Sequence, residues 1–168
     1  PLPVDAPTGK KVAVIGGGPA GLAAALDLRT FGHDVVIFES AKELGGVLRY
    51  GIPEFRLPKS ILDYELSILS TMGISCRTGV TVGKDITIPE LFNNENFDAV
   101  FIGNGAGLAL KTGVPGEDLK GVFTAEEYLR KGNLREEIAS GENVVNVGGG
   151  DVAMDASRMA FRLGAKKV

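Results

Sequence analysis

The stretch VAVIGGGPAGLAAA, from Val12 to Ala25, decides the fold of this chain. Its first four residues form an apolar run typical of a buried strand, and its alanine- and leucine-rich end is typical of a helix packed on a sheet. Between them, Gly16, Gly18 and Gly21 have the G-x-G-x-x-G spacing. The first glycine allows a tight turn, the second a close approach to a pyrophosphate, and the third close helix–strand packing. The stretch therefore predicts a dinucleotide-binding turn.

A carboxylate follows at the end of the next apolar run. Val35 to Phe38 is predicted to be the second strand, and Glu39 stands at its tip. A carboxylate there accepts hydrogen bonds from ribose hydroxyls, each worth about 1.5–3 kcal/mol for a charged acceptor. A 2′-phosphate would instead meet like charge, at a cost of up to about 4 kcal/mol near a protein surface. We therefore expect this turn to hold FAD or NAD, and not NADP.

A second fingerprint, NVVNVGGGDVAMDA, runs from Asn143 to Ala156. Its first residues are predicted to form a strand, Gly148-x-Gly150-x-x-Ala153 is the variant with alanine as third member, and a helix follows. Two such units indicate a protein that binds two dinucleotides. Alternating strands and helices predict a Rossmann-like α/β fold, with a parallel sheet, flanking helices and ligands at the carboxyl edge of the strands. Strands are expected near 11–15, 34–38, 74–77, 98–102 and 143–147, and helices near 19–31, 59–72, 124–131 and 151–163.

Composition narrows the class of protein. Hydrophobic residues make up 44% and charged residues 23%, as in a globular domain, and the net charge of −3 gives no reason to expect nucleic acid. No apolar run approaches the ~20 residues of a membrane span, and Pro1 to Lys10 lacks the features of a secretory signal. A single cysteine suits a reducing compartment. We expect a cytoplasmic protein without nucleic-acid or membrane partners.

The single cysteine also bears on the reaction. Disulfide reductases with two dinucleotide-binding domains need a redox-active cysteine pair, which this chain lacks, so Cys76 is expected to be a small buried hydrophobe. His33 has no second histidine or cysteine nearby and is expected to be structural, so no metal site is predicted. No side chain stands out as a catalytic acid, base or nucleophile, so none is predicted.

The run ELGGVLRYGIPEFRLPK, from Glu43 to Lys59, carries a more specific resemblance. It is similar to the glutamate synthase small-subunit family of flavoproteins. That family includes the NADPH-binding subunit of NADH-dependent ferredoxin:NADP oxidoreductases and the N-terminal half of dihydropyrimidine dehydrogenase. The sequence of this run looks most like the ferredoxin:NADP oxidoreductase branch. The resemblance extends from about Pro3 to the end of the chain. It implies an N-terminal extension over residues 1–10, the N-terminal part of an FAD-binding domain over 11–140, and the truncated start of an NAD(P)-binding domain over 141–168.

The resemblance also implies roles for individual residues. The FAD pyrophosphate would lie on the first glycine turn and the adenosine near the tip of the second strand, while the Gly46 loop would continue toward the flavin. The implied FAD contacts are Gly16, Gly18, Pro19, Ala20, Gly21, Glu39, Lys42, Gly46, Val47, Arg56, Val82, Gly103 and Gly105. The implied contacts with NADPH are Gly149, Gly150, Asp151 and Val152. Two of these keep a structural alternative, a surface salt bridge for Arg56 and helix-dipole stabilisation for Asp151.

The function implied is a flavin-dependent oxidoreductase that passes electrons between NADPH and iron–sulfur partners through FAD, by hydride transfer and then single-electron transfer. The clusters would lie outside this chain, in an iron–sulfur domain or subunit, and the glutamate synthase large subunit is another possible partner. The chain stops at Val168, so we expect a fragment that binds FAD weakly and is inactive alone. The alternative is a non-catalytic nucleotide-binding fragment or subunit-contact module. The final acceptor, the choice of NADP or NAD at the second turn, the oligomeric state and the retention of FAD stay open.

Overall fold

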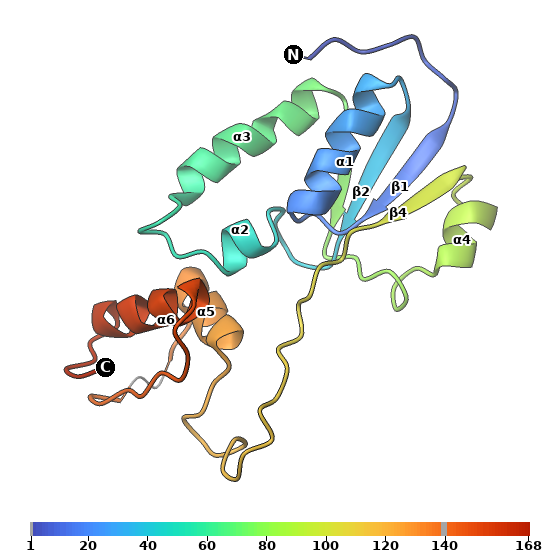
Figure 1. The fold of residues 1–168 in the computed structure, drawn as a ribbon. Coiled ribbons are helices and arrows are strands. Elements are labelled where there is room, and N and C mark those ends of the chain that lie inside the picture. The colour runs from blue at the N-terminus through green and yellow to red at the C-terminus, as the bar shows by residue number, and fades with distance from the viewer. Residues whose placement is uncertain (1, 139–140) are drawn as a thin grey trace. The chain divides into compact units, whose positions relative to one another are not determined.

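The computed structural model describes residues 2–138 and 141–168, which divide into two compact units (Figure 1). Unit 1 comprises Pro1–Leu48 and Lys59–Gly105, and unit 2 comprises Arg49–Pro58 and Ala106–Val168. The chain therefore leaves unit 1 for a ten-residue excursion, Arg49–Pro58, and returns to it before the final crossing.

Unit 1 is built on a four-stranded parallel sheet in the order β3-β2-β1-β4. Its strands are β1 (Lys11–Ile15), β2 (Asp34–Glu39), β3 (Ser75–Thr78) and β4 (Ala99–Ile102). β1 lies between β2 and β4, with Val14 opposite Ile37 on one side and Phe101 on the other. All four carboxyl ends meet at one edge, where β1 and β2 deliver the glycine turn and Glu39. The expectation of a Rossmann-like parallel sheet is confirmed.

Helices cover both faces of this sheet. On one face, α1 (Pro19–Thr30) and α3 (Lys59–Thr71) pack through Leu22 and Leu69 against Val14 and Ile37. On the other face, α4 (Ile88–Asn93) contributes its buried leucine to a separate apolar cluster. Burial on both faces accounts for the almost continuous apolar sequences of β1 and β2.

The residues before β1 are fastened to the turn between α1 and β2. The Asp5 N–H donates to the Thr30 carbonyl at 2.8 Å, and the Thr8 N–H donates to the Gly32 carbonyl at 3.0 Å. Gly32 has a φ of +81°, and a Cβ there would overlap the carbonyl of Ala6. Only glycine fits this position, because it tolerates both the conformation and the contact.

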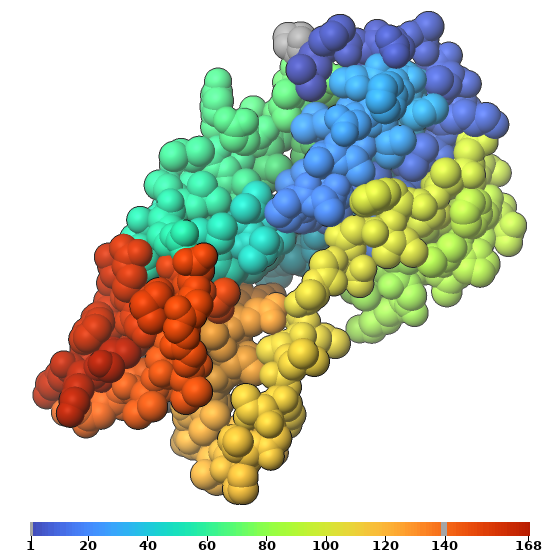
Figure 2. Space-filling view, viewed as in Figure 1, coloured from blue at the N-terminus to red at the C-terminus, as the bar shows by residue number. Residues whose placement is uncertain are grey.

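Unit 2 contains two helices, α5 (Ala125–Leu134) and α6 (Asp151–Arg162). They pack through Tyr128 and Leu129 against Met159 and Ala160. A Cβ at Gly132 would lie 3.0 Å from Met159, so a glycine in α5 allows the close approach of α6. The loop from residue 106 to 122 lies at the surface (Figure 2). Its most exposed apolar side chains are Leu108 and Leu110.

The predicted strand at 143–147 is wrong. The described residues there form one isolated bridge, between Asn143 and Lys167, and Val145 and Val147 are 89% and 90% exposed. A strand requires a hydrogen-bonded neighbour along its length, and residues 166–167 supply too short a partner. The apolar run is therefore present without the ladder that would bury it.

Two further differences concern unit 1. Cys76 was expected to be buried, but it is exposed because β3 is an edge strand. Its partial covering still raises the pKa of the thiol by desolvation. The structure also adds two short helices, α2 (Val47–Tyr50) and α4, that the periodicity did not predict. No helix in the described part of the chain combines the length and apolar character needed to cross a bilayer.

Candidate functional site

The first glycine turn is closed so tightly that only glycine fits at its key positions. Gly16 has a φ of +101°, and a Cβ on it would overlap the carbonyl of Gly103. A Cβ on Gly21 would overlap the carbonyl of Gly16 and lie 3.2 Å from Val14. The Gly16 N–H donates to the Phe38 carbonyl at 2.8 Å. Helix α1 is thus held directly against the turn, as the third glycine of the motif requires.

Glu39 lies against this turn. Its Oε2 accepts the Gly17 N–H at 2.7 Å, while its Oε1 accepts the Ala41 N–H at 2.7 Å and the Ser40 hydroxyl at 3.1 Å. The residue is 8% exposed. A carboxylate can accept about four hydrogen bonds, so these three leave one lone-pair site for a ligand hydroxyl. The strand tip and the glycine turn therefore form one structure.

A second loop meets the first through its backbone. The Gly45 N–H donates to the Gly17 carbonyl at 2.7 Å. Gly46 has a φ of +51°, and a Cβ there would lie 2.7 Å from the Cα of Gly18. Gly45 also has a positive φ, +120°. The result is a cradle with walls of bare backbone, formed by residues 16–18, 45–46 and 103, and we call it the glycine cradle.

The helix that opens at the cradle begins without a side-chain cap among the described residues. Gly18 is the N-cap of α1 and has no side-chain capping bond within the described part of the chain, and the first turn contains no acidic residue. By contrast, α4 and α5 begin with Thr87 and Thr124, whose hydroxyls cap the helix. The first N–H groups of a helix lack internal partners and favour anions. The cradle, its donors and Glu39 thus fit a dinucleotide, with the pyrophosphate at α1 and a ribose at Glu39.

The structure brings together only some of the residues proposed for FAD. In unit 1, Pro19 and Ala20 lie in the first turn of α1, Lys42 is exposed in the loop after β2, and Val47 is exposed at the start of α2. Val82 is half-buried. It lies two residues after Val80, whose N–H donates to the Glu39 carbonyl at 3.0 Å. The cradle gathers Gly16, Gly18, Gly21, Glu39, Gly46 and Gly103, whereas Gly105 stands open with no atom within 4 Å of an added Cβ.

Arg56 has a different setting. It belongs to unit 2, where its Nη1 pairs with the Asp155 carboxylate at 2.8 Å. The Asp155 side chain is 7% exposed, and its Oδ1 finds no hydrogen-bond partner among the described residues. The salt-bridge alternative for Arg56 is therefore present, but its partner is a buried carboxylate of α6. No local sequence pattern predicts this ion pair, because the two residues are 99 positions apart.

The second glycine turn is open. Gly148 has a φ of +136°, and an added Cβ at Gly149 or Gly150 would meet nothing within 4 Å. Gly150 caps α6 without a side-chain hydrogen bond from any described residue, and Asp151 and Val152 are exposed in the first turn. Asn146 steadies the turn by donating to the Ala153 carbonyl and to the Ser157 hydroxyl. The N-terminus of α6 can receive an anion, but the Asp151 carboxylate in its first turn already interacts with the positive end of the helix dipole.

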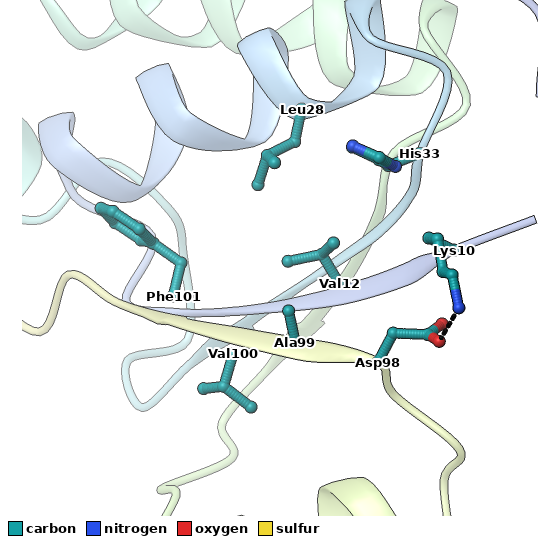
Figure 3. Close-up of a pocket in the computed structure, with 8 residues that line it drawn as sticks. All are labelled: Lys10, Val12, Leu28, His33, Asp98, Ala99, Val100 and Phe101. Carbon is teal, nitrogen blue, oxygen red and sulfur yellow. Dashed lines mark hydrogen bonds and ion pairs between the residues drawn. The ribbon is translucent and has the colours of Figure 1, made fainter. Parts of the chain in front are cut away.

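Unit 1 also has a cavity of about 500 Å³ at the opposite, amino-terminal end of β1 and β4 (Figure 3). Leu28 of α1 points toward the sheet there, and Lys10 pairs with Asp98 at the rim at 2.9 Å. The charges of Lys10 and Asp98 neutralise each other and most other lining residues are apolar. The cavity therefore has fewer groups that could bind a polar ligand than the glycine cradle has. Within the described residues, no cluster of histidine, cysteine and acidic side chains could hold a metal ion.

Comparison with known proteins assigns the family. The profile described as pyridine nucleotide-disulphide oxidoreductase matches residues 10–168, almost the whole chain. The chain belongs to this family. The chain is also similar to the glutamate synthase small chain of Halomonas elongata, 41% identical over 172 residues that cover 96% of this chain. The resemblance to the glutamate synthase small subunit is confirmed.

Two other known proteins are similar to this chain. They are the NADP(+)-dependent formate dehydrogenase subunit beta of Moorella thermoacetica, 43% identical over 96% of this chain, and the putative oxidoreductase AegA of Escherichia coli, 42% identical over 95%. The chain spans 23% and 26% of their lengths, and 36% of the Halomonas protein. The relatives are thus about three to four times as long as the chain.

Solved structures share the fold of this chain. FprA of Mycobacterium tuberculosis in complex with NADPH matches 89% of this chain at 26% identity, with a TM-score of 0.73, and the match covers 36% of FprA. A 2-naphthoyl-CoA reductase matches 96% of this chain with a TM-score of 0.76, and the match covers 24% of that protein. At 22% identity, the second likeness concerns the fold alone.

Proposed function

We propose that this chain forms the FAD-binding part, and the start of the NADPH-binding part, of a flavin-dependent oxidoreductase that passes electrons between NADPH and iron–sulfur partners. The observation that carries the proposal is the Glu39 carboxylate, held on the Gly17 N–H at 2.7 Å within a cradle of bare backbone. The names of the relatives, which include glutamate synthase small chains and an NADP(+)-dependent formate dehydrogenase subunit, support the same class of reaction.

The residues of unit 1 would hold FAD as follows. The N–H groups at the start of α1 would face the pyrophosphate, and residues 16–18, 46 and 103 would let the backbone come close because they carry no Cβ. Glu39 would accept hydrogen bonds from a ribose hydroxyl, with Lys42 and Val82 nearer the adenine. Val47 and Gly105 of unit 1 are proposed to continue the contact toward the flavin, and so is Arg56, which belongs to unit 2. FAD, when bound, would accept two electrons from NADPH and release them singly.

The N-terminus of α6 is the proposed NADPH site. Gly149 and Gly150 leave space for a pyrophosphate, and Asp151 and Val152 border it. The proposed division into FAD-binding residues 11–140 and NAD(P)-binding residues 141–168, after an extension over residues 1–10, places one nucleotide in each part. The proposed partners are an iron–sulfur domain or subunit, or a glutamate synthase large subunit, and the proposed location is the cytoplasm.

Flavin titration of the full chain tests the proposal. Uptake of FAD with low affinity, seen as quenching of flavin fluorescence, is the expected result. A single slow loss of the flavin absorbance when NADPH is added without oxygen is expected as well, but no sustained turnover. Glu39→Gln should weaken FAD binding about tenfold or more, because it removes a charged acceptor worth about 1.5–3 kcal/mol. Glu65→Gln, an exposed carboxylate on α3, is the matched control and should change nothing.

The outcomes separate the rival functions. FAD uptake without bleaching by NADPH would favour a nucleotide-binding module that does not turn over. Failure to take up FAD would overturn the proposal and favour a subunit-contact role.

A further inference from the structure

Unit 2 has a cavity of its own, with a volume of about 300 Å³. Its lining comes from the excursion Arg49–Pro58 and from the carboxyl-terminal ends of α5 and α6, so the whole cavity belongs to one compact unit. Charges of both signs, an amide and two apolar groups meet there. The side chains are those of Glu54, Phe55, Asn133, Arg135, Met159 and Arg162.

Arg162 is held in place but keeps most of its hydrogen-bonding capacity. Its guanidinium carbon lies 3.8 Å from the ring centre of Phe55, and its Nη1 donates to the Arg158 carbonyl at 3.0 Å. A guanidinium has five N–H donors, and this bond uses one of them. No carboxylate among the described residues pairs with Arg162, whereas Lys166 is paired with Glu142 at 2.6 Å. A fixed guanidinium of this kind is suited to bind a carboxylate through two parallel hydrogen bonds.

Arg135 has a backbone conformation that is unfavourable for its residue type. It ends α5 with a φ of +54° and a ψ of +32°, the left-handed conformation that is usually occupied by glycine at this position. Strained residues of this kind are common at binding sites. The alternative role is structural, because a cation at the carboxyl-terminal end of a helix interacts favourably with the helix dipole. The two roles predict different effects of a glycine substitution.

The cavity also has a hydrogen-bond acceptor that lacks a donor. The Asn133 Nδ2 donates to the carbonyls of Tyr50 and Ile52 at 3.0 and 3.1 Å, which fixes the amide. Its Oδ1 is buried and finds no hydrogen-bond partner among the described residues. A buried acceptor without a donor is destabilising, so a ligand that donates to it would gain affinity. Glu54 and the carboxyl-terminal ends of two helices place further negative charge at the same walls.

We propose that this cavity binds a free α-amino acid with an apolar side chain. Arg135 and Arg162 would bind its carboxylate, and its ammonium group would donate to the Oδ1 of Asn133. A simple anion would leave this acceptor without a charged donor and would meet the helix ends, while a simple cation would meet two arginines. A zwitterion complements both kinds of group.

The apolar part of the cavity fits the side chain of such a ligand. Phe55 is half-buried and Met159 is buried, so a ligand side chain would lie against an aromatic ring and a thioether. Binding sites for small molecules have volumes of about 300–1,000 Å³, and this cavity is at the lower limit. A ligand of the size of a single amino acid is therefore expected.

The cavity is separate from the proposed NADPH site. It lies near the end of α6, at Met159 and Arg162, whereas the second glycine turn precedes the start of that helix at Asp151. A helix of 12 residues is about 18 Å long. The inference therefore goes beyond the proposed function and does not depend on it.

Calorimetric titration of the full chain, without any cofactor, is the first test. L-leucine should bind, and its analogues 4-methylpentanoate, which lacks the ammonium group, and 3-methylbutylamine, which lacks the carboxylate, should bind about tenfold more weakly or worse. Equal binding of either analogue would overturn the proposal. So would the absence of binding by L-leucine, L-methionine and L-phenylalanine alike at concentrations up to about 10 mM.

The second test separates a binding role of Arg135 from a structural one. Arg135→Gly should weaken L-leucine binding about tenfold. It should also raise the midpoint of chemical denaturation, because glycine adopts a φ of +54° without strain. Loss of binding therefore could not be attributed to unfolding. Unchanged affinity in this variant would overturn the proposal. Lys120→Gln, which changes an exposed cation of unit 2 outside the cavity, is the control and should leave both quantities unchanged.

A third measurement concerns the form of the carboxylate contact and the separation of the two sites. Arg162→Lys keeps the charge but not the planar pair of donors, so it should also weaken L-leucine binding, and an unchanged affinity would contradict the proposed contact. Saturating NADP⁺ should leave the affinity for L-leucine within about twofold. Displacement of L-leucine by NADP⁺ would make the cavity part of the nucleotide site and overturn the proposal, whatever the outcome of the flavin titration.

Discussion

The two glycine turns of this chain have similar sequences and different structures. The turn at residues 16–21 follows a strand paired on both sides, and its glycines touch the backbone of Gly103 and Gly46. The turn at residues 148–153 follows a run with a single bridge, and two of its glycines touch nothing. A fingerprint therefore specifies local conformation, but the rigidity of the site comes from the strands and loops packed around it.

The largest expected difference between the turns lies in their tolerance of a methyl group. Gly21→Ala should lower the free energy of unfolding of unit 1 by about 3 kcal/mol or more, because the Cβ would overlap the Gly16 carbonyl. Gly150→Ala should change the stability of unit 2 by less than about 1 kcal/mol, since its φ is −82° and the space is open. Chemical denaturation of both variants measures the contrast. Similar losses would mean that the second turn is as closely packed as the first.

The carboxylates at the two turns should act in opposite directions. Glu39 is proposed to hold its ligand, whereas Asp151 lies in the first turn of α6, where its charge competes with a phosphate. Asp151→Asn should therefore tighten NADP⁺ binding by up to about fivefold, the equivalent of about 1 kcal/mol. Calorimetric titration measures the affinity, and Glu126→Gln in the first turn of α5 is the control. Weaker binding by Asp151→Asn would make this carboxylate a ligand of the nucleotide.

The smallest expected effect is a difference in acid sensitivity between the units. In unit 1 the pKa of Glu95 is lowered from its ordinary 4.5, first by hydrogen bonding to Arg77. The pKa of Asp98 is lowered from 3.8, first by the Lys11 N–H and then by Lys10. The pKa of Glu90 is lowered by its bonds with Thr87. In unit 2, the pKa of Glu117 is lowered by the N–H groups of Thr112 and Gly113.

The sign of the pH effect follows from these directions. A carboxylate with a lowered pKa in the folded state stabilises the protein above its unfolded pKa, and this contribution disappears as the pH falls through the folded value. Unit 1 should therefore lose stability below about pH 4.5, more than unit 2, and Asp98→Asn should flatten its profile. Denaturation between about pH 6 and pH 3 measures this. A steeper loss in unit 2 would contradict it.

Sequence alone predicted the elements whose pattern is local. β1 and the Gly16 turn were predicted because an apolar run and glycine spacing suffice, and the burial of β1 between β2 and β4 agrees with its uniform apolar character. The capping box of α4, Thr87 with Glu90, also has a local signature, and it could have revealed that helix.

The rest depended on contacts between distant residues. The run at 143–147 has the composition of a strand, but the chain supplies little to pair with it. Cys76 is exposed because β3 lies at the edge of the sheet, a position that the local sequence does not reveal. Within unit 2, Asn133 contacts Tyr50 and Asp155 contacts Arg56, across 83 and 99 residues of sequence, so no spacing rule could have predicted these contacts.

The position of β4 in the sheet has a consequence for the order of assembly during synthesis. β1, α1 and β2 are consecutive and can associate as soon as they leave the ribosome, whereas β4 must return to β1 across 87 residues, the separation that the bond from Lys11 to Asp98 spans. Gly103, which closes the turn at Gly16, therefore joins last. The nascent chain would therefore contain the glycine motif long before it could retain a cofactor. We expect the cofactor to bind only after β4 has joined the sheet.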